Sequence, residues 1–241
     1  MKTVGIIGYG QFGAFMTKHL ARHCAVLVSS SKKIESLPHG AQQADLQRVC
    51  DADIVIFSIP MNAFESVCTV TQSLISEKSI IIDVTSVKMR PLALLEQYFP
   101  HHERLGTHPI FGPQSGKDGI EGLPLVLCNQ TCSKESYQTI KSFCSDVLKL
   151  SITETTPEIH DREMAHVQGL THFIGRALTD MGIAASPLAT QSYKQLVELV
   201  RLVGTDSWDL FETIQNNNPH TQSVRNAFID ALSDIEKKLH S

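Results

Sequence analysis

The sequence predicts an α/β fold, a Rossmann-type doubly wound parallel sheet followed by a small all-helical domain. Three observations predict this architecture. A glycine-rich turn, Gly8–Gly13, directly follows the first apolar run. Further short apolar runs alternate with helical stretches as far as residue 150, which is typical of a sheet covered on both faces. After Pro157 these runs stop and helical spacing takes over, so we predict two domains, 1–152 and 153–241.

The predicted strands are short apolar runs separated by helical stretches. The first helical pattern, Phe15, Met16 and Leu20, follows the glycine turn and ends near His23. Runs with apolar residues at successive positions indicate parallel strands between two layers of helices. These runs are Val4–Ile7, Ala25–Val28, Asp53–Ile59, Ile80–Val84 and Leu123–Cys128.

The last third of the chain predicts helices, and Glu158–Met181 reads as one long helix. Asn218 is a good N-cap for the last helix, and Pro219 suits its first position. A module of this size has little core alone, so we expect it to pack on the first domain or on a second subunit. Its apolar residues at helical spacing are Met164, Val167, Thr171, Ile174 and Leu178, then Tyr193, Leu196, Val197, Val200 and Val203, then Val224, Phe228, Leu232, Ile235 and Leu239.

Composition limits the function classes. The 241 residues carry 21 basic and 25 acidic side chains, a net charge of −4 without long runs of either sign, which argues against nucleic acid or a membrane as partner. No apolar stretch approaches the ~20 residues that span a bilayer, and no secretory signal is recognised. The six cysteines form no CxxC pair, so we expect reduced thiols and no metal site. We therefore expect a cytoplasmic protein that acts on a small molecule.

The turn Gly8-Tyr9-Gly10-Gln11-Phe12-Gly13 predicts a dinucleotide site, because it lies between a strand and a helix. Gly8 allows the tight turn, Gly10 lets the backbone approach a pyrophosphate, and Gly13 lets the helix pack closely. The phosphates would lie at the helix N-terminus, where free N–H groups favour anions. The alternative is a plain glycine-rich turn. We assign residues 1–152 to dinucleotide binding.

The loop after the second strand favours NADP over NAD. NAD-binding units usually carry an acidic residue there for the ribose hydroxyls, whereas this chain has Ser30, Ser31, Lys32 and Lys33. Hydroxyl and ammonium groups could bind a 2′-phosphate, and no carboxylate would repel it. The alternative is that both lysines belong to a solvated loop.

Polar residues follow the third and fourth apolar runs. Ligands of open α/β sheets bind beyond the carboxyl ends of the strands, which makes Ser58, Pro60 and Ser86 candidates for the site. For Ser86 the alternative is a serine that only caps a turn. Asp83 is expected to anchor that turn.

His108 is the strongest candidate for chemistry. It follows a weak strand pattern, stands between Thr107 and Pro109, and is expected in a loop stiffened by Pro113 and made close-fitting by Gly106, Gly112 and Gly116. A rigidly held histidine suits proton transfer, because its ordinary pKa is nearest to neutral pH. The alternative is a structural histidine.

The predicted helix Glu158–Met181 also carries a polar stripe. Asp161, Ala165, Gln168 and His172 recur at helical spacing and therefore share one face. Such a stripe predicts a helix that lines a cleft, and a solvated face would give the same spacing.

In these segments the chain resembles the TyrA family, the prephenate and arogenate dehydrogenases, and is most similar to the plant-type arogenate enzymes. The matching segments are Gly8–Gly13, Asp83–Lys88, Thr107–Lys117, His160–Phe173 and Tyr193–Phe211, the last including Gly204–Leu210. The resemblance spans nearly the whole chain in order, and its His-Pro-x-Phe-Gly-Pro element is highly specific.

The resemblance implies NADP-dependent oxidative decarboxylation of a cyclohexadienyl acid, arogenate or prephenate, in tyrosine biosynthesis. It implies that His108 accepts the hydroxyl proton, that Ser86 helps hold His108 and the hydroxyl, and that His172 lies on the substrate side. Thr107, Gln168 and Lys194 are then substrate-binding candidates. The domain 153–241 would bind substrate and form a homodimer, and no metal is needed.

At two positions the chain departs from the family pattern. Lys194 stands where enteric-type members have an arginine for the substrate carboxylate, and Ser30-Ser31 stands where plant-type members have Ser-Arg. Two other functions stay open: another NADP-linked reductase of small acids or imines, and a non-catalytic dinucleotide sensor. Such reductases usually rely on a lysine and lack the His-Pro-x-Phe-Gly-Pro loop. A sensor would not need Ser86, His108 and His172.

Overall fold

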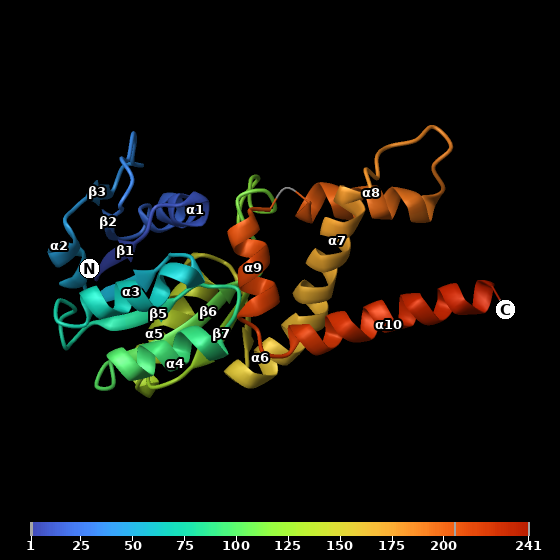
Figure 1. Ribbon diagram of the computed structural model, residues 1–241. Coiled ribbons are helices and arrows are strands. Elements are labelled where there is room, and N and C mark those ends of the chain that lie inside the picture. The colour runs from blue at the N-terminus through green and yellow to red at the C-terminus, as the bar shows by residue number, and fades with distance from the viewer. Residues whose placement is uncertain (1, 205, 241) are drawn as a thin grey trace. The chain divides into compact units, whose positions relative to one another are not determined.

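The computed structural model describes residues 2–204 and 206–240 and divides into two compact units, Met1–Pro157 and Glu158–Ser241 (Figure 1). The assignment of residues 1–152 to dinucleotide binding and of 153–241 to substrate binding and dimerisation stays a prediction. Thr205, within the matching segment Gly204–Leu210, lies outside the described residues.

The first unit is built on one mixed sheet, which confirms the predicted α/β class. Among the described residues the strand order is β3-β2-β1-β4-β5-β6-β7-β8. Neighbouring strands are parallel from β3 to β6, β7 is antiparallel to β6, and β8 is parallel to β7. The strands are β1 Thr3–Ile7, β2 Ala25–Ser29, β3 Ala41–Gln43, β4 Ile54–Phe57, β5 Ile80–Asp83, β6 Glu103–Pro109, β7 Pro124–Asn129 and β8 Ser151–Glu154.

The sheet differs in two respects from the predicted all-parallel arrangement. The run Leu123–Cys128 forms β7, which runs against its neighbour β6. Two further strands, β3 and β8, were not predicted by any apolar run, because they are short and mostly polar, and β6 was indicated only by the weak strand pattern before His108. Strands of this kind at the two edges of a sheet bury little surface, so the pattern of apolar residues cannot reveal them.

Helices cover both faces of the sheet, which explains the continuous apolar runs. Successive strand residues point to opposite faces, so Ile7, Phe57 and Ile81 lie in one core and Ile6, Ile56 and Ile82 in the other. The first core also holds residues of α2 Leu46–Cys50, α3 Met61–Thr71 and α4 Met89–Tyr98. The second holds residues of α1 Gln11–Leu20, α5 Lys134–Ser142 and the π-helix η1 Phe143–Val147.

The second unit is helical, as predicted, but its first helix is not one regular α-helix. The predicted helix Glu158–Met181 consists of α6 Pro157–Met164, the π-helical segment η2 Ala165–Leu170 and α7 Thr171–Asp180. Gly169 and Gly175 allow close packing, because a Cβ at these positions would meet Thr221 and Val203, respectively. The remaining helices are α8 Gln191–Val203, α9 Trp208–Asn216 and α10 Thr221–Leu239.

The predicted start of the last helix is wrong. Helix α10 begins at Thr221, and no side chain caps that end. Asn218 is buried instead, where its amide donates to the Asp161 carbonyl (2.7 Å) and its carbonyl accepts from the His220 N–H (2.9 Å). The side-chain NH₂ of Asn218 thus joins the start of α10 to α6, while its side-chain oxygen accepts a local N–H two residues later in the chain.

None of the helices that the structure describes combines the length and the apolar character that are needed to cross a bilayer. The six cysteines are all free thiols. The predicted cytoplasmic location stays a prediction.

Candidate functional site

The glycine-rich turn joins the end of β1 to the start of α1. Gly8 has a φ of +105° and its N–H donates to the Ser29 carbonyl of β2 at 2.8 Å. A Cβ at Gly8 would collide with the Ser58 carbonyl that follows β4. Glycine is therefore required here both by the left-handed backbone and by the approach of the neighbouring strand.

Gly13 and Gly10 have different surroundings. A Cβ at Gly13 would collide with the Gly8 carbonyl, whereas a Cβ at Gly10 would meet nothing within 4 Å. Gly10 is the N-cap of α1, no side chain caps this end, and no acidic residue lies in its first turn. The open space at Gly10 thus lies before the positive end of a helix, where a pyrophosphate group fits.

The neighbouring segments complete this edge of the sheet. The Ser58 N–H donates to the Ile7 carbonyl at 2.9 Å, and Pro60 precedes α3 as its N-cap residue. The Tyr9 hydroxyl donates to the Ser36 carbonyl at 3.3 Å, which ties the turn to the segment after β2. Because β1 lies between β2 and β4, the strand order reverses here, and open α/β sheets bind ligands at such a point.

The loop after β2 is basic. The Lys32 N–H donates to the Ser30 hydroxyl at 3.1 Å, and the side chains of Lys32 and Lys33 are exposed. No carboxylate occurs between Ser29 and Lys33. The residues at this edge fit a dinucleotide, and the predicted ones that follow β1, β2 and β4 are Gly8, Tyr9, Gly10, Gln11, Phe12, Gly13, Ser30, Ser31, Lys32, Lys33, Ser58 and Pro60.

His108 lies in a strand and not in a loop, contrary to the prediction. It is the penultimate residue of β6, is 4% exposed and pairs with Val126 of β7. The antiparallel partner β7 pairs with His108 itself, and the parallel partner β5 pairs with β6 as far as Gly106. The strand therefore supplies the rigidity that was attributed to a loop. Of the predicted close-fitting glycines, Gly106 and Gly116 are closely approached, while a Cβ at Gly112 would be free.

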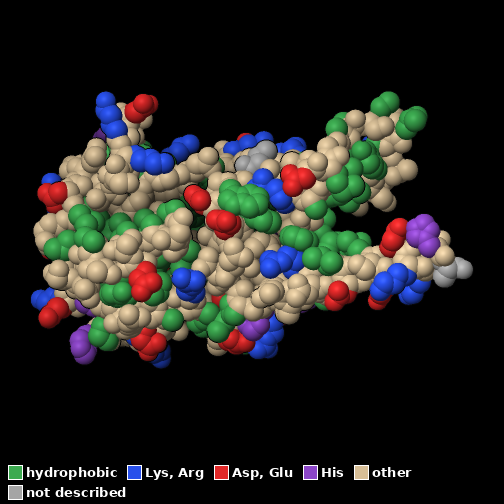
Figure 2. All heavy atoms as spheres, in the orientation of Figure 1, with side chains coloured by type: hydrophobic (Ala, Val, Ile, Leu, Met, Phe, Trp, Pro, Cys, Tyr) green, Lys and Arg blue, Asp and Glu red, His purple; other side chains and the backbone are tan. Residues whose placement is uncertain are grey.

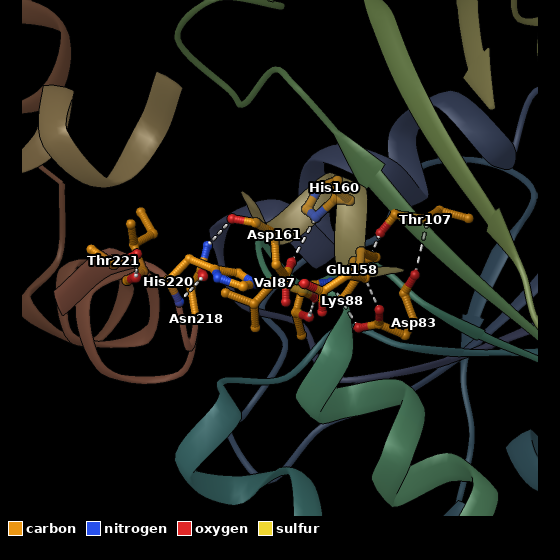
Figure 3. Close-up of polar contacts among 12 residues, drawn as sticks. Asp83, Val87, Lys88, Thr107, Glu158, His160, Asp161, Asn218, His220 and Thr221 are labelled. Carbon is orange, nitrogen blue, oxygen red and sulfur yellow. Dashed lines mark hydrogen bonds and ion pairs between the residues drawn. The ribbon is translucent and has the colours of Figure 1, made fainter. Parts of the chain in front are cut away.

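A buried polar network lies where β5 ends (Figure 3). The Lys88 ammonium contacts the Asp83 carboxylate and donates to the Thr107 carbonyl at 2.7 Å. The Asp83 carboxylate accepts from the Thr85 N–H at 2.8 Å, so Asp83 anchors the turn that carries Ser86, as predicted. Burial raises the pKa of the Asp83 carboxyl, and the Lys88 ammonium opposes that shift.

A second polar cluster belongs to the helical unit. His172 Nδ1 lies 3.3 Å from the Asp206 carboxylate, and Arg176 Nη2 donates to the Asp206 carbonyl at 2.8 Å. The Arg176 guanidinium stacks over the rings of Trp208 and Phe211, each at 5.4 Å. Arg176 Nε is buried and has no hydrogen-bond partner among the described residues.

Burial is the main cause of the pKa shifts in this cluster. Burial, helped by the nearby Arg176 cation, lowers the pKa of His172 to about 4, so the imidazole is neutral at pH 7. Burial raises the pKa of the Asp206 carboxyl, and Arg176 opposes that rise. The cluster therefore presents a neutral imidazole, a cation and a partly buried acid close together.

The predicted polar stripe behaves differently along its length. Asp161 and Ala165 are buried, and Asp161 pairs with His160 at 2.7 Å. The π-helical segment η2 then changes the register, because its i→i+5 bonds turn less per residue than an α-helix. Gln168 and His172 are half-buried beyond this change, and Lys194 is exposed on α8.

Sequence reasoning missed Arg176 and Asp206. Arg176 follows His172 by one helical turn, so the spacing that singled out His172 also marked it. Asp206 lies three positions after the end of α8, and its only signal was its place in the matching segment Gly204–Leu210. Among the described residues, no group of three or more His, Cys, Asp or Glu side chains is arranged to hold a metal ion.

Comparison with known proteins adds independent findings. Residues 28–149 match the family model described as prephenate dehydrogenase, nucleotide-binding domain, and residues 177–241 match a model described as TYRAAT1-like, C-terminal domain. Arogenate dehydrogenase 2, chloroplastic, of Arabidopsis thaliana is 30% identical over 98% of this chain and 69% of its own length. Arogenate dehydrogenase 1, chloroplastic, of the same plant is 27% identical over 98% of this chain and 39% of its own.

The fold also resembles a solved structure. Prephenate dehydrogenase from A. aeolicus, in complex with hydroxyphenyl propionate and NAD⁺, aligns with a TM-score of 0.75 over 99% of this chain and 91% of that chain. The sequence identity is 18%, so this likeness concerns the fold.

Proposed function

Because the chain belongs to the TyrA family of prephenate and arogenate dehydrogenases, we propose that it catalyses the NADP-dependent oxidative decarboxylation of arogenate or prephenate. One observation carries the proposal. Gly8, Ser58, Ser86 and His108 follow or end β1, β4, β5 and β6, and these adjacent parallel strands all end at the same edge of one sheet. A dinucleotide turn and a buried histidine thus share one edge.

The chemistry follows from these groups. A bound nicotinamide supplies the acceptor for the hydride of the hydroxyl-bearing ring carbon. His108 takes the hydroxyl proton as that carbon becomes a carbonyl, and Ser86 orients the hydroxyl. The bond to the ring carboxylate then breaks, CO₂ leaves, and the electron pair moves through the ring to the carbonyl oxygen, which regains the proton held by His108 to give an aromatic phenol. Because His108 is 4% exposed, it is screened from water, which favours loss of CO₂.

The cofactor is NADP in this proposal, and the support is the loop after β2. Ser30 and Ser31 offer hydroxyls, Lys32 and Lys33 offer exposed ammonium groups, and no acid occurs between Ser29 and Lys33, where NAD-binding units usually carry one for the ribose. A 2′-phosphate carries the charge that these groups complement.

Arogenate is the preferred substrate in this proposal, and the support is Asp206. Arogenate differs from prephenate by an ammonium group in place of a keto oxygen. The Asp206 carboxylate suits that ammonium, and the Arg176 guanidinium beside it suits the adjoining side-chain carboxylate. Lys194, the predicted carboxylate partner, is exposed, and its role stays a prediction along with those of Thr107 and Gln168.

The deciding experiment is an assay of the purified protein with both substrates and both cofactors, read from the absorbance of reduced nicotinamide. We expect the highest kcat/KM for arogenate with NADP⁺. Turnover with prephenate alone would contradict the role of Asp206. Binding of NADP⁺ without turnover of either substrate would leave a dinucleotide sensor, and turnover of another small acid would leave a different reductase.

We also propose a homodimer formed through the helical domain. Hydrophobic side chains lie at the surface over α8 and the loop before it (Figure 2), where Met181 is 72% and Leu188 90% exposed. On α10, Leu232, Ile235 and Leu239 are also exposed, although apolar spacing had predicted a packed face. Such surfaces usually mark association. Light scattering should give twice the chain mass, and a monomer at micromolar concentration would refute the dimer.

A further inference from the structure

Lys88 is a buried cation that the proposed chemistry does not use. It lies at the start of α4, and its side chain is 0% exposed. A buried ammonium is costly unless it is paired, and a buried ion pair is seldom more stabilising than apolar side chains of the same size. Stability alone therefore does not account for a lysine at this position.

The contacts of Lys88 join three segments. Its ammonium contacts the carboxylate of Asp83, the last residue of β5, and donates to the carbonyl of Thr107 in β6 at 2.7 Å. The Thr107 hydroxyl donates to the Asp83 carbonyl at 2.8 Å, which closes the link between β5 and β6. The peptide bond whose carbonyl accepts from Lys88 is the one that leads into His108.

The turn that carries Ser86 is held by the same Asp83 carboxylate that contacts Lys88. The Asp83 carboxylate accepts from the Thr85 N–H, and the Thr85 hydroxyl donates to the Val87 carbonyl, both at 2.8 Å. Ser86 thus stands between Thr85, which bonds to the carboxylate facing Lys88, and Val87, which bonds to the Thr85 hydroxyl. One ammonium therefore connects the backbone of Ser86 with the backbone of His108.

Gly106 makes room for this arrangement. A Cβ at Gly106 would lie 3.2 Å from Lys88 Cδ and 2.8 Å from Leu92 Cδ1. The aliphatic stem of Lys88 therefore passes close over the strand that carries Thr107 and His108. A side chain at position 106 would push the stem away from its partners.

We propose that Lys88 is a positioning residue, which fixes Ser86 relative to His108 through Asp83 and the Thr107 carbonyl. This inference rests on the proposed function only for its kinetic readout. Displacing a reacting group by about 1 Å can lower turnover by roughly 10², and the ammonium provides a rigid link between the two groups.

The test compares Lys88→Met with the double variant Asp83→Asn/Lys88→Met. The single variant leaves the buried Asp83 without its counterion, so its thermal midpoint should fall. The double variant removes both charges and should recover most of that midpoint. We expect kcat to stay roughly 10-fold to 100-fold low in both, with KM for NADP⁺ within about twofold. Lys78 is exposed and lies just before β5, the strand that ends in Asp83, so Lys78→Met is the matched control.

Recovery of kcat together with the thermal midpoint in the double variant would overturn the proposal, because a stabilising role alone would then explain Lys88. A second readout does not need turnover. In ¹⁵N-histidine-labelled protein, with His108 assigned by its loss in His108→Asn, the ring signals of His108 should shift in the double variant and not in Lys78→Met. Unchanged signals would also overturn the proposal, whereas a wild-type protein without turnover would refute only the proposed function.

Discussion

The sheet edge that carries the glycine-rich turn and the polar cluster of the helical unit are built in different ways. At the sheet edge, Gly8 and Ser58 directly follow the ends of β1 and β4. A Cβ at Gly8 or at Gly13 would collide with a backbone carbonyl, so the backbone itself fixes these positions. In the helical unit, His172, Arg176 and Asp206 meet through side chains that belong to α7 and the segment after α8. The sheet edge is therefore specified by short sequence motifs, whereas the helical cluster depends on which helices pack together.

The largest expected effect concerns the histidine of the sheet edge. His108→Asn should lower turnover by roughly 10²–10⁴, because the proton acceptor is lost, while the affinity for NADP⁺ stays near normal. Steady-state kinetics and cofactor titration measure both quantities. The exposed His101→Asn serves as control. Unchanged turnover in His108→Asn would remove that histidine from the chemistry.

The second largest expected effect concerns Asp206 of the helical cluster and not the sheet edge. Asp206→Asn should lower kcat/KM for arogenate by roughly 10-fold to 100-fold, since a hydrogen bond between charged groups is lost. The value for prephenate and the affinity for NADP⁺ should change little. The exposed Asp209→Asn on α9 is the control. Equal losses for both substrates would mean that Asp206 only supports the fold.

Two glycines of one turn provide a sharper comparison within the sheet edge. Gly13→Ala should lower the free energy of unfolding by about 1–3 kcal/mol, because its Cβ would collide with the Gly8 carbonyl. Gly10→Ala should leave stability unchanged and weaken NADP⁺, because the space around it is open. Denaturant unfolding and cofactor titration measure the two effects. Normal NADP⁺ affinity in Gly10→Ala would place the pyrophosphate elsewhere.

The smallest expected effect concerns the basic loop. Replacing Lys32 and Lys33 together by Ala should weaken NADP⁺ by roughly tenfold and NAD⁺ by less than twofold, because exposed charges contribute modestly. Isothermal titration with both cofactors measures the difference. Lys237→Ala/Lys238→Ala at the end of α10 removes the same charge as a control. An equal loss for NADP⁺ and NAD⁺ would mean that the lysines do not contact the 2′-phosphate.

Local patterns predicted most strands in the middle of the sheet, indicated β6 only weakly, and failed at the edges of the sheet. Ile80–Asp83 was visible because both of its faces are buried, whereas β3 and β8 bury too little apolar surface to leave a pattern. The Gly8–Gly13 turn was equally visible, because steric limits on the backbone act over a few residues. The π-helical segment η2 left no signal, since the same residues suit an α-helix.

The sequence by itself determined the α/β class, the cofactor turn and the candidates Ser86 and His108, because those features depend on residues close together in the chain. Only the tertiary structure decided that His108 lies in a strand beside an antiparallel partner, that Lys88 links it to the Ser86 turn, and that Asp206 meets His172 and Arg176. Such contacts join residues far apart in sequence. Their partners are chosen by packing and by the need to pair buried charge, which no local pattern encodes.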